Sequence, residues 1–315
     1  MQSLMTYENN QTIQYPQTNF AKASVVSYPN RDNRYGDNQY RGNCSGKLIE
    51  DLIGFFKPKH FTDVCEGGGT SRDVCKTLGI PYTGLDLRYG QDFTSDSVLN
   101  KLNGKHTSLC FSHPPYWNMI PYSGNMWNGK EKHLADTSHC LTVDEFLYKS
   151  QVMLMNQREA TEEGGIYTTL IGDMKKKGVL YSFQSDFIQM MPKSELLNVV
   201  IKMQHNTHSE NTMYTNRNFI PIAHEYLILW KKKRASMFAV GLEIASDLTK
   251  KVAATWRSVI RIVMMKLGKA TLEDIYAAVE NEAASLIANN PNWKAKIRQK
   301  LQKHHTNVNR GVWAA

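Results

Sequence analysis

The sequence contains no apolar run long enough to cross a lipid bilayer, which takes about 20 consecutive apolar residues. The longest clean apolar stretches are short, as in Tyr-Leu-Ile-Leu-Trp at 226–230. The N-terminus is polar at Glu8 to Gln11, where a secreted protein would carry an apolar signal core. We therefore expect a cytoplasmic protein that does not bind a membrane.

Cysteine is scarce, and its spacing suits neither disulfides nor zinc. The number of cysteines is odd, and no Cys-x-x-Cys pair is present, although disulfide frameworks and zinc ribbons need such close spacing. His205 and His208 are close in sequence, but no third ligand accompanies them. We expect no metal site and reduced, mostly buried thiols at Cys44, Cys65, Cys75, Cys110 and Cys140.

The composition is that of a globular protein, but its charge is unevenly distributed. Of the 315 residues, 41% are hydrophobic and 21% charged, which allows a sizeable core and about two domains. Residues 231–315 hold 16 Lys and Arg against 6 Asp and Glu, whereas residues 1–230 hold 22 against 23. A nearly neutral body with a basic C-terminal part favours a catalytic unit joined to a nucleic-acid-binding unit over a solubilising tail.

Short apolar runs alternate with helical patterns over residues 35–232, which predicts a mainly parallel α/β sheet. Residues 1–34, rich in Asn, Gln, Tyr and Ser, predict a flexible arm. We expect helices at 46–57, 70–78 and 142–160, and strands at 60–65, 82–87, 109–112, 165–171, 197–203 and 225–230.

The C-terminal part changes in character after a basic linker at 233–251. Residues 252–315 predict three helices, at 252–267, 271–288 and 291–302, followed by a hairpin. This order is typical of a small winged helix-turn-helix domain, which binds DNA.

A glycine cluster follows the first predicted strand, in Asp63-Val-Cys-Glu-Gly-Gly-Gly-Thr-Ser71. Adjacent glycines let a backbone approach a ligand closely, and the start of the next helix offers free N–H groups. The next strand ends in Gly84-Leu-Asp86, and an acidic residue at that place is how such folds hold a ribose diol. No Gly-Lys-Ser/Thr ends the cluster, so a Walker-type phosphate loop is not indicated.

A second motif, Ser112-His-Pro-Pro-Tyr-Trp117, follows a later predicted strand. Paired prolines rigidify a loop and donate no hydrogen bonds, which leaves backbone carbonyls free to accept. An aromatic ring beside those carbonyls can form a slot for a flat heterocycle with an exocyclic amino group. Taken alone, the motif is better explained by a structural Pro-Pro turn.

Together the two motifs resemble those of the amino-methylating DNA methyltransferases, which transfer a methyl group from S-adenosylmethionine to adenine N6 or cytosine N4. The family's first motif, Asp-Pro-Phe-x-Gly-x-Gly-Thr-Thr, is matched at Asp63, Gly67, Gly69 and Thr70. Its second motif, Asp/Asn/Ser-Pro-Pro followed by Tyr, Phe or Trp, is matched except at His113. The late segment His-Glu-Tyr-Leu at 224–227 also looks like the family's. The resemblance covers about 40–232, in the gamma-type motif order.

The resemblance implies a Rossmann-like class I methyltransferase domain and a role for each matched residue. Tyr116 would stack on a flipped base, and the carbonyl of Pro114 beside Pro115 would accept an amino proton. Neutral His113 would replace the family's side-chain oxygen as an acceptor. Cofactor contacts would come from Asn43, Ser45, Asp63, Cys65, Glu66, Gly67, Gly68, Gly69, Asp86, Asp92 and Phe93.

The third predicted C-terminal helix carries many basic and amide side chains around an apolar face of Trp293, Ile297 and Leu301. A charge run is often only a solvated face, but the basic excess of this part favours phosphate contact. The residues expected to contact DNA are Asn292, Lys294, Lys296, Arg298, Lys303 and Arg310.

The sequence therefore predicts a DNA adenine-N6 methyltransferase that uses S-adenosylmethionine and acts on a base flipped out of double-stranded DNA. Cytosine N4 stays open as the target, and so does a catalytically silent DNA-binding protein that keeps the fold. A homodimer and a cognate restriction enzyme are compatible partners, and the sequence selects neither.

Overall fold

The computed structural model describes residues 5–7, 13, 15–30, 32–127, 129, 133–205, 220–288 and 290–314. The chain forms two compact units, Met1–Val240 and Gly241–Ala315. Each unit has its own buried core.

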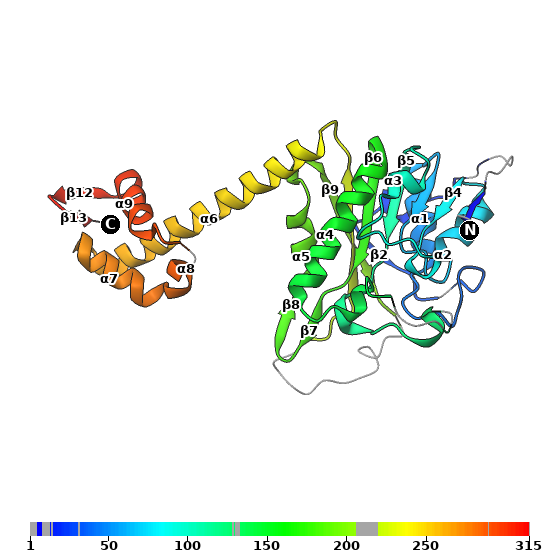
Figure 1. Cartoon of the computed structure of the whole chain (residues 1–315), viewed down its shortest axis with the longest axis horizontal. Coiled ribbons are helices and arrows are strands. Elements are labelled where there is room, and N and C mark those ends of the chain that lie inside the picture. Colours follow the sequence, from blue (N-terminus) through cyan, green and yellow to red (C-terminus); the bar gives the residue numbers. More distant parts are fainter. Residues whose placement is uncertain are drawn as a thin grey trace. The chain divides into compact units, whose positions relative to one another are not determined.

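The first unit is built on a sheet whose described strands follow the order β1-β4-β3-β5-β6-β10-β9-β2 (Figure 1). Strands β3, β4, β5 and β6 run parallel, and β10 runs antiparallel to both β6 and β9. The bounds are β1 Met5–Tyr7, β2 Val25–Ser27, β3 Phe61–Asp63, β4 Tyr82–Gly84, β5 Thr107–Ser112, β6 Thr161–Ile171, β9 Leu196–Met203 and β10 His224–Lys231. The predicted Rossmann-like α/β fold is confirmed.

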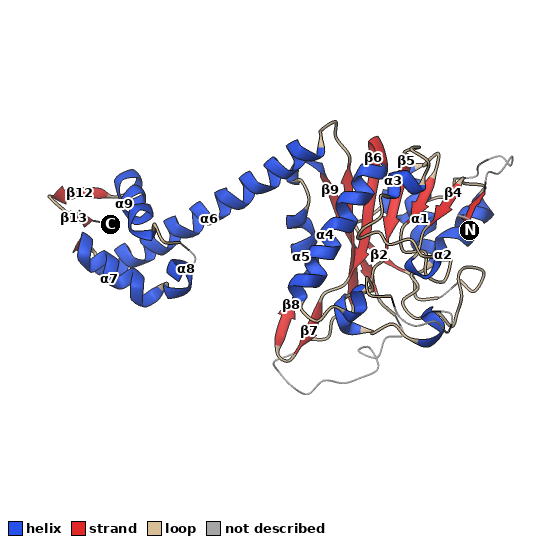
Figure 2. Ribbon diagram, viewed as in Figure 1, coloured by secondary structure: helices blue, strands red, loops and turns tan. Residues whose placement is uncertain are grey.

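Helices cover both faces of this sheet, as Figure 2 shows. Successive strand residues point to opposite faces, so Phe111 of β5 packs with Leu48 and Val74, while Cys110 packs with Phe146. The first face is covered by α1 Gly46–Phe56 and α2 Thr70–Leu78, and the second by α3 Val98–Lys101, α4 Val143–Ala160 and α5 Phe183–Met190. The 3-10 helices are η1 Asn19–Ala21, η2 Leu87–Tyr89, η3 Trp117–Met119, η4 Gly124–Trp127, η5 Thr137–His139 and η6 Lys193–Glu195.

Local signals fix the ends of the main helices. The Thr142 hydroxyl accepts from the Glu145 N–H and starts α4, as its sequence predicts. Helix α2 lies between Gly69 and Gly79, which both adopt the left-handed conformation. Helix α1 ends at a left-handed Lys57 just before Pro58.

The N-terminal segment predicted as a flexible arm contributes a strand to each edge of the sheet. Strand β1 pairs with β4, and β2 pairs with β9. The buried Asp51 carboxylate accepts from the Asn19 N–H (2.7 Å) and the Tyr28 hydroxyl (2.5 Å). Short edge strands without periodicity give little sequence signal. These long-range pairings and hydrogen bonds hold the segment against the sheet.

Two further elements follow β6 that the periodicity did not indicate. A hairpin of β7 Met174–Lys176 and β8 Val179–Tyr181 precedes α5. The segment 117–141, between β5 and α4, holds three of the 3-10 helices, and most of 204–221, between β9 and β10, lies outside the described residues.

The second unit combines helices with a three-stranded sheet of order β11-β13-β12 among its described residues. Its core packs Trp256, Ile260, Ile275, Ile297 and Leu301. A reciprocal capping box between Thr271 and Asp274 starts its second helix. The bounds are α6 Met237–Leu267, β11 Lys269–Thr271, α7 Leu272–Glu282, α8 Ala284–Ala288, α9 Trp293–His304, β12 Thr306–Asn309 and β13 Val312–Ala314.

Helix α6 differs from the helix predicted at 252–267, because it begins at Met237. Most of the segment expected to be a basic linker, 233–251, is therefore helical. Within the described residues, no helix combines the length and the apolar character that a membrane span requires.

A buried ion pair ties the end of the sheet to the chain that follows it. The Arg158 guanidinium donates to both Glu195 carboxylate oxygens, at 2.8 and 2.6 Å, and to the Lys233 carbonyl at 3.1 Å. The Tyr167 hydroxyl and the Lys233 N–H also donate to Glu195. Both charged side chains are 1% exposed, so this network replaces their lost water.

Replacing Arg158 by Met should lower the free energy of unfolding by roughly 3–5 kcal/mol, because the Glu195 charge then stays buried without its cation. Urea unfolding followed by circular dichroism measures the change. Arg34→Ala is the control, since the Arg34–Asp32 pair has a 66% exposed arginine and should leave the midpoint unchanged. An Arg158→Met midpoint equal to that of wild type would contradict this structural role.

Candidate active site

The glycine loop between β3 and α2 is held by Asp63, which ends β3. Its carboxylate accepts from the Cys65 N–H (2.9 Å) and from the Ser71 hydroxyl (2.6 Å), so it ties the loop to the first turn of α2. Burial raises the pKa of Asp63 to about 7, although both hydrogen bonds oppose that rise. Gly67 and Gly69 have φ values of 53° and 83°, a conformation that favours glycine.

Asp86, just after β4, joins this loop to the neighbouring strand. Its Oδ2 accepts from the Gly67 N–H and its Oδ1 from the Arg88 N–H, both at 2.8 Å. A carboxylate has about four acceptor positions, so both oxygens keep capacity for a ligand. The Arg88 guanidinium lies over the Tyr40 ring, 4.8 Å from its centroid, and donates to the Gly67 carbonyl.

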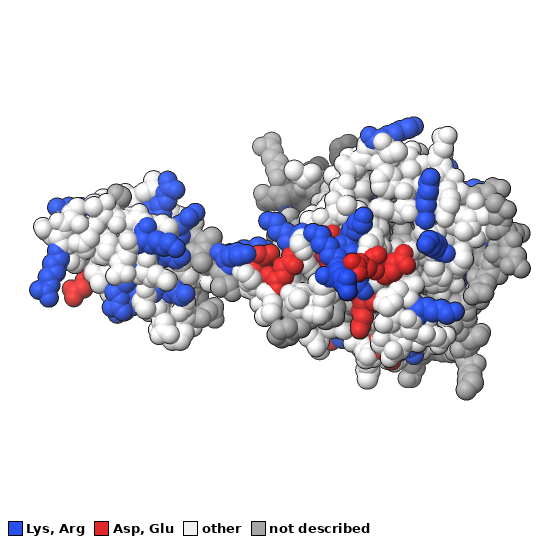
Figure 3. Space-filling model, turned by 90° about the horizontal axis from the view of Figure 1, so that it is seen from above, with Lys and Arg blue, Asp and Glu red and all other residues white. Residues whose placement is uncertain are grey.

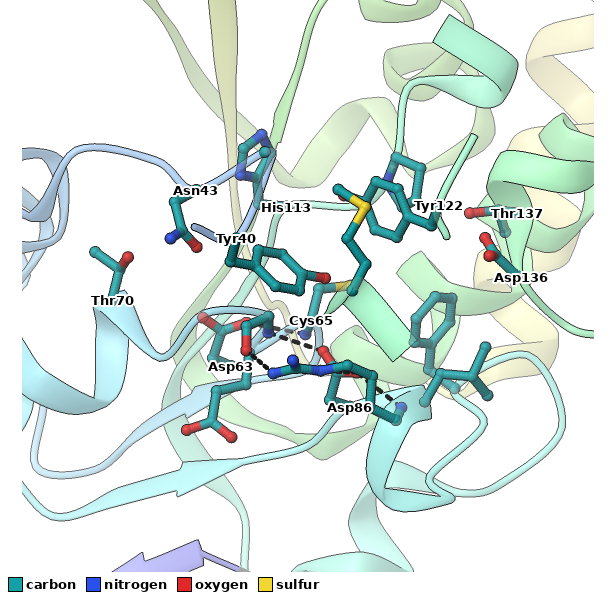
Figure 4. Close-up of a pocket in the computed structure, with 18 of the residues that line it drawn as sticks. Tyr40, Asn43, Asp63, Cys65, Thr70, Asp86, His113, Tyr122, Asp136 and Thr137 are labelled. Carbon is teal, nitrogen blue, oxygen red and sulfur yellow. Dashed lines mark hydrogen bonds and ion pairs between the residues drawn. The ribbon is translucent and has the colours of Figure 1, made fainter. Parts of the chain in front are cut away.

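A cavity opens beside this loop. Figure 4 shows Asp63 and Asp86 on one side of it and His113 and Tyr122 on another. Thr70 and Thr137 line it from opposite sides of the view, and their buried hydroxyls have no hydrogen-bond partner among the described residues. Its apolar walls come from Tyr40, Cys44, Phe93, Phe111, Met126 and Trp127.

The Pro-Pro motif follows β5, and its side chains form a hydrogen-bonded chain. His113 Nε2 lies 2.9 Å from the Tyr116 hydroxyl, which donates to Glu225 Oε1 at 2.7 Å. Lys202 donates to Glu225 Oε2 at 2.6 Å. The four side chains come from the loop after β5, from β9 and from β10, so the sheet brings together residues that are far apart in sequence.

Burial and neighbouring charges determine which of these four hydrogen-bonded side chains are ionised. Burial lowers the pKa of His113 to about 4, and Glu225 opposes this shift while Lys202 adds to it. Burial alone would raise the pKa of Glu225, but the charge of Lys202 and the hydrogen bonds from Lys202 and Tyr116 outweigh it and lower that pKa. The group is therefore a neutral histidine, a tyrosine and a carboxylate–ammonium pair at neutral pH.

A second cavity, of about 270 Å³, lies beyond the Pro-Pro motif. It shares a wall with the first, made by Gly42, Asn43, His113, Pro115 and Tyr122. Pro114, Tyr116, Lys202 and Glu225 line the second cavity alone. Gly172 lets the Tyr116 ring lie close, because a Cβ there would come within 2.8 Å of a ring carbon.

Most of the predicted site residues line one of these two cavities. The first holds Asn43, Asp63, Cys65, Glu66, Gly67, Asp86 and Phe93, and the second holds Pro114 and Tyr116. Gly68 and Gly69 lie in the glycine loop but line neither cavity. Gly68 donates to Asn43 Oδ1 at 3.3 Å, and Gly69 is the N-cap residue of α2.

Two predicted cofactor residues lie elsewhere. Ser45 is the N-cap residue of α1 and lines neither cavity. The Asp92 carboxylate holds a local turn, where it accepts from the Thr94 N–H (2.8 Å), the Thr94 hydroxyl (2.6 Å) and the Ser95 hydroxyl (2.9 Å).

Sequence reasoning missed Glu225, Lys202 and Arg88. Glu225 carried a signal, since an acidic residue inside the apolar run of β10 has to find a partner when buried. Nothing local marked Lys202 or Arg88.

Within the described part of the chain, no three His, Cys, Asp or Glu side chains group to hold a metal ion. His205 bonds to the Ser27 hydroxyl at 2.8 Å, and His208 lies outside that part.

In the second unit, Trp293, Ile297 and Leu301 are buried, which confirms the apolar face of α9. Asn292, Lys294, Lys296, Arg298, Lys303 and Arg310 are exposed. Lys294 lies 5.2 Å from the ring centroids of both Tyr276 and Trp293.

No protein-family model matches the chain, and no curated protein matches it either. Among solved structures, TrmN from Thermus thermophilus is 12% identical, with a TM-score of 0.36 over 61% of this chain and 50% of that one. A candidate DNA modification methylase from the same organism, complexed with S-adenosyl-L-methionine, is 16% identical, with a TM-score of 0.29 over 56% and 57%. TehB from Haemophilus influenzae is 13% identical, with a TM-score of 0.33 over 59% and 62%.

The chain thus spans between half and two thirds of the length of these three proteins. TM-scores of this size are too low to carry an argument about function. The assignment of a function therefore depends on the geometry of the site.

His113 should stay neutral well below the ordinary histidine pKa of about 6.5. We expect ¹⁵N-histidine-labelled protein to show His113 as the neutral imidazole, with a single N–H, at pH 5.5, because burial disfavours the charged imidazolium. Nitrogen NMR over pH 5–8 makes the measurement, and loss of the signal in His113→Asn assigns it. The exposed His106 provides the comparison within the same sample. Half-protonation of His113 near pH 6.5 would contradict its burial.

Proposed function

We propose that the first unit transfers a methyl group from S-adenosylmethionine to adenine N6 of a base extruded from double-stranded DNA. The observation that carries this proposal is the pair of cavities that share a wall at His113 and Pro115. Group transfer needs a donor site and an acceptor site in contact, and catalysis then depends mostly on positioning.

The first cavity has the chemistry that S-adenosylmethionine requires. The carboxyl groups of Asp63, Glu66 and Asp86 line it and offer oxygen atoms as hydrogen-bond acceptors to a ligand. Asp86 retains acceptor capacity for a ribose diol, and the hydroxyls of Thr70 and Thr137 still need partners. When bound there, S-adenosylmethionine would supply an electrophilic methyl group on a positively charged sulfur.

The second cavity suits a flat base that carries an amino group. The Tyr116 ring offers a stacking surface, and stacking of this kind contributes about 1–3 kcal/mol per base. The Pro114 carbonyl can accept from the amino group, since the two prolines leave no competing N–H donor at 114 and 115. His113 supplies a ring nitrogen at the position where the amino-methylating DNA methyltransferases, which the motif resembles, have a side-chain oxygen.

The second unit is the proposed DNA-binding part, as a winged helix. Its order of helix, strand, helix, short helix, helix and hairpin among the described elements supports that proposal. Figure 3 shows Lys and Arg side chains spread over the visible face of this unit with few acidic ones among them. Lys300 and Lys303 lie in α9, and Arg257 and His304 line a common surface pocket of this unit.

The test of this function uses the full chain, tritium-labelled S-adenosylmethionine and unmodified double-stranded DNA. Enzymatic digestion and mass spectrometry of the nucleosides should show N6-methyladenine. N4-methylcytosine would instead make cytosine the target. Binding of S-adenosylmethionine and DNA without any modified base would overturn catalysis and favour a silent DNA-binding protein.

Asp86→Ala should weaken S-adenosylmethionine binding by roughly 1.5–3 kcal/mol, because it removes a charged hydrogen-bond acceptor for the ribose. Calorimetric titration measures this loss. Asp92→Ala is the matched control, since Asp92 follows the same strand but lines neither cavity. Equal affinity in the Asp86 variant and wild type would remove Asp86 from the cofactor site.

The double change Lys300→Gln and Lys303→Gln should make DNA binding less dependent on salt. Each phosphate that is no longer neutralised should reduce the slope of log affinity against log salt concentration by about 0.9. Fluorescence anisotropy over a salt series gives the slope, with Lys105→Gln in the first unit as control. If the double variant keeps the wild-type slope, as the Lys105→Gln control should, this face of the second unit does not contact DNA phosphate.

A further inference from the structure

Glu225 is separated from the Pro-Pro motif in sequence but touches its tyrosine. It lies in β10, is 6% exposed, and accepts from Tyr116 and Lys202 through separate oxygens. An acidic residue in a buried strand is costly unless its hydrogen bonds are complete. This pair of bonds satisfies the carboxylate and holds it ionised beside the tyrosine hydroxyl.

The direction of each hydrogen bond in this chain follows from counting protons. Lys202 can only donate, and the ionised Glu225 can only accept. The single hydroxyl proton of Tyr116 therefore points to Glu225 Oε1. The Tyr116 oxygen is left as an acceptor, so the bond to His113 must be donated by Nε2–H.

We infer that Glu225 and Lys202 are positioning residues that fix His113 as the Nε2–H tautomer and so keep its Nδ1 available as the hydrogen-bond acceptor for the target amino group. This inference rests on the proposed methyl transfer. A neutral imidazole has one donor and one acceptor nitrogen, so the bond that one nitrogen makes determines what the other can do. Glu225 would thus act on the reaction through Tyr116 without touching the base.

Glu225→Gln provides a sharp test because it should reverse the direction of the hydrogen bonds that connect residue 225, Tyr116 and His113. The new side-chain amide must present its oxygen to the Lys202 ammonium, which leaves its NH₂ facing Tyr116. Tyr116 then accepts from the amide and donates its own proton to His113 Nε2. His113 should change to the Nδ1–H tautomer and lose its acceptor, although free histidine prefers Nε2–H.

Nitrogen NMR of ¹⁵N-histidine-labelled protein reports this tautomer without any need for activity. Wild type should show His113 protonated at Nε2, and Glu225→Gln should show it protonated at Nδ1. Adding Tyr116→Phe to Glu225→Gln removes the hydroxyl that connects them, so the double variant should return to Nε2–H. The nearby His224, which bonds to Tyr226 at 2.8 Å, should keep one tautomer throughout.

Methyl incorporation should follow the tautomer. Replacing an orienting carboxylate by an amide can cost up to about 10⁴-fold in rate when it leaves a histidine in the wrong tautomer. We expect Glu225→Gln to lose at least about tenfold in kcat with unchanged S-adenosylmethionine affinity, and the double variant, which keeps an aromatic ring for stacking, to recover part of that loss.

The outcomes separate this inference from the proposed function. An unchanged Nε2–H signal in folded Glu225→Gln protein would overturn the inference, whatever the activity. Full activity in a variant that does change tautomer would overturn the acceptor role of Nδ1. Reversal of the tautomer in a protein that methylates no DNA would support the hydrogen-bonded chain and overturn methyl transfer.

Discussion

The hydrogen bond from the Gly67 N–H to the Asp86 carboxylate is the contact on which the first cavity depends. It joins the loop after β3 to the end of β4, two neighbouring parallel strands whose carboxyl ends meet at one edge of the sheet. With Asp63 tied to α2 on the other side, the glycine loop is held at both ends. A side chain at position 67 would come within 2.9 Å of the Tyr40 ring, so this closure needs glycine.

A similar constraint shapes the second cavity, where polar groups must lie inside a packed sheet. Tyr116 reaches Glu225 across the sheet from the loop after β5 to β10, and Gly172 leaves room for its ring. The polar chain that results is complete from His113 to Lys202. A complete network holds its members in one arrangement, whereas a partly satisfied one would favour rearrangement. The ring that forms one wall of the cavity is thereby fixed in orientation.

The parts of the site that the sequence predicted are those formed by neighbouring residues. The glycine loop, the Pro-Pro motif and the acid after β4 each lie within one strand–loop segment. Glu225, in contrast, is 109 positions from Tyr116, and only the strand order brings them together. Asp92 illustrates the opposite case, because the Thr and Ser that follow it capture its carboxylate in a local turn. The edge strands β1 and β2 were missed because residues 1–34 are rich in Asn, Gln, Tyr and Ser and show no period, whereas the equally short β3 and β4 adjoin the motifs that marked them.

The wall between the two cavities places conflicting demands on residue 113. In the proposed reaction, a histidine at this position must be neutral to accept from an amino group, and carboxyl groups line the cavity on one side while a lysine lies on the other. An aspartate there would add a fourth carboxyl group beside those of Asp63, Glu66 and Asp86, and a protonated histidine could not accept. Burial resolves this by keeping the imidazole uncharged, and the Tyr116–Glu225 bond then decides which nitrogen holds the proton. Under the proposed function, a histidine can therefore replace the side-chain oxygen of the family that the motif resembles, because β9 and β10 supply the Lys202–Glu225 pair behind it.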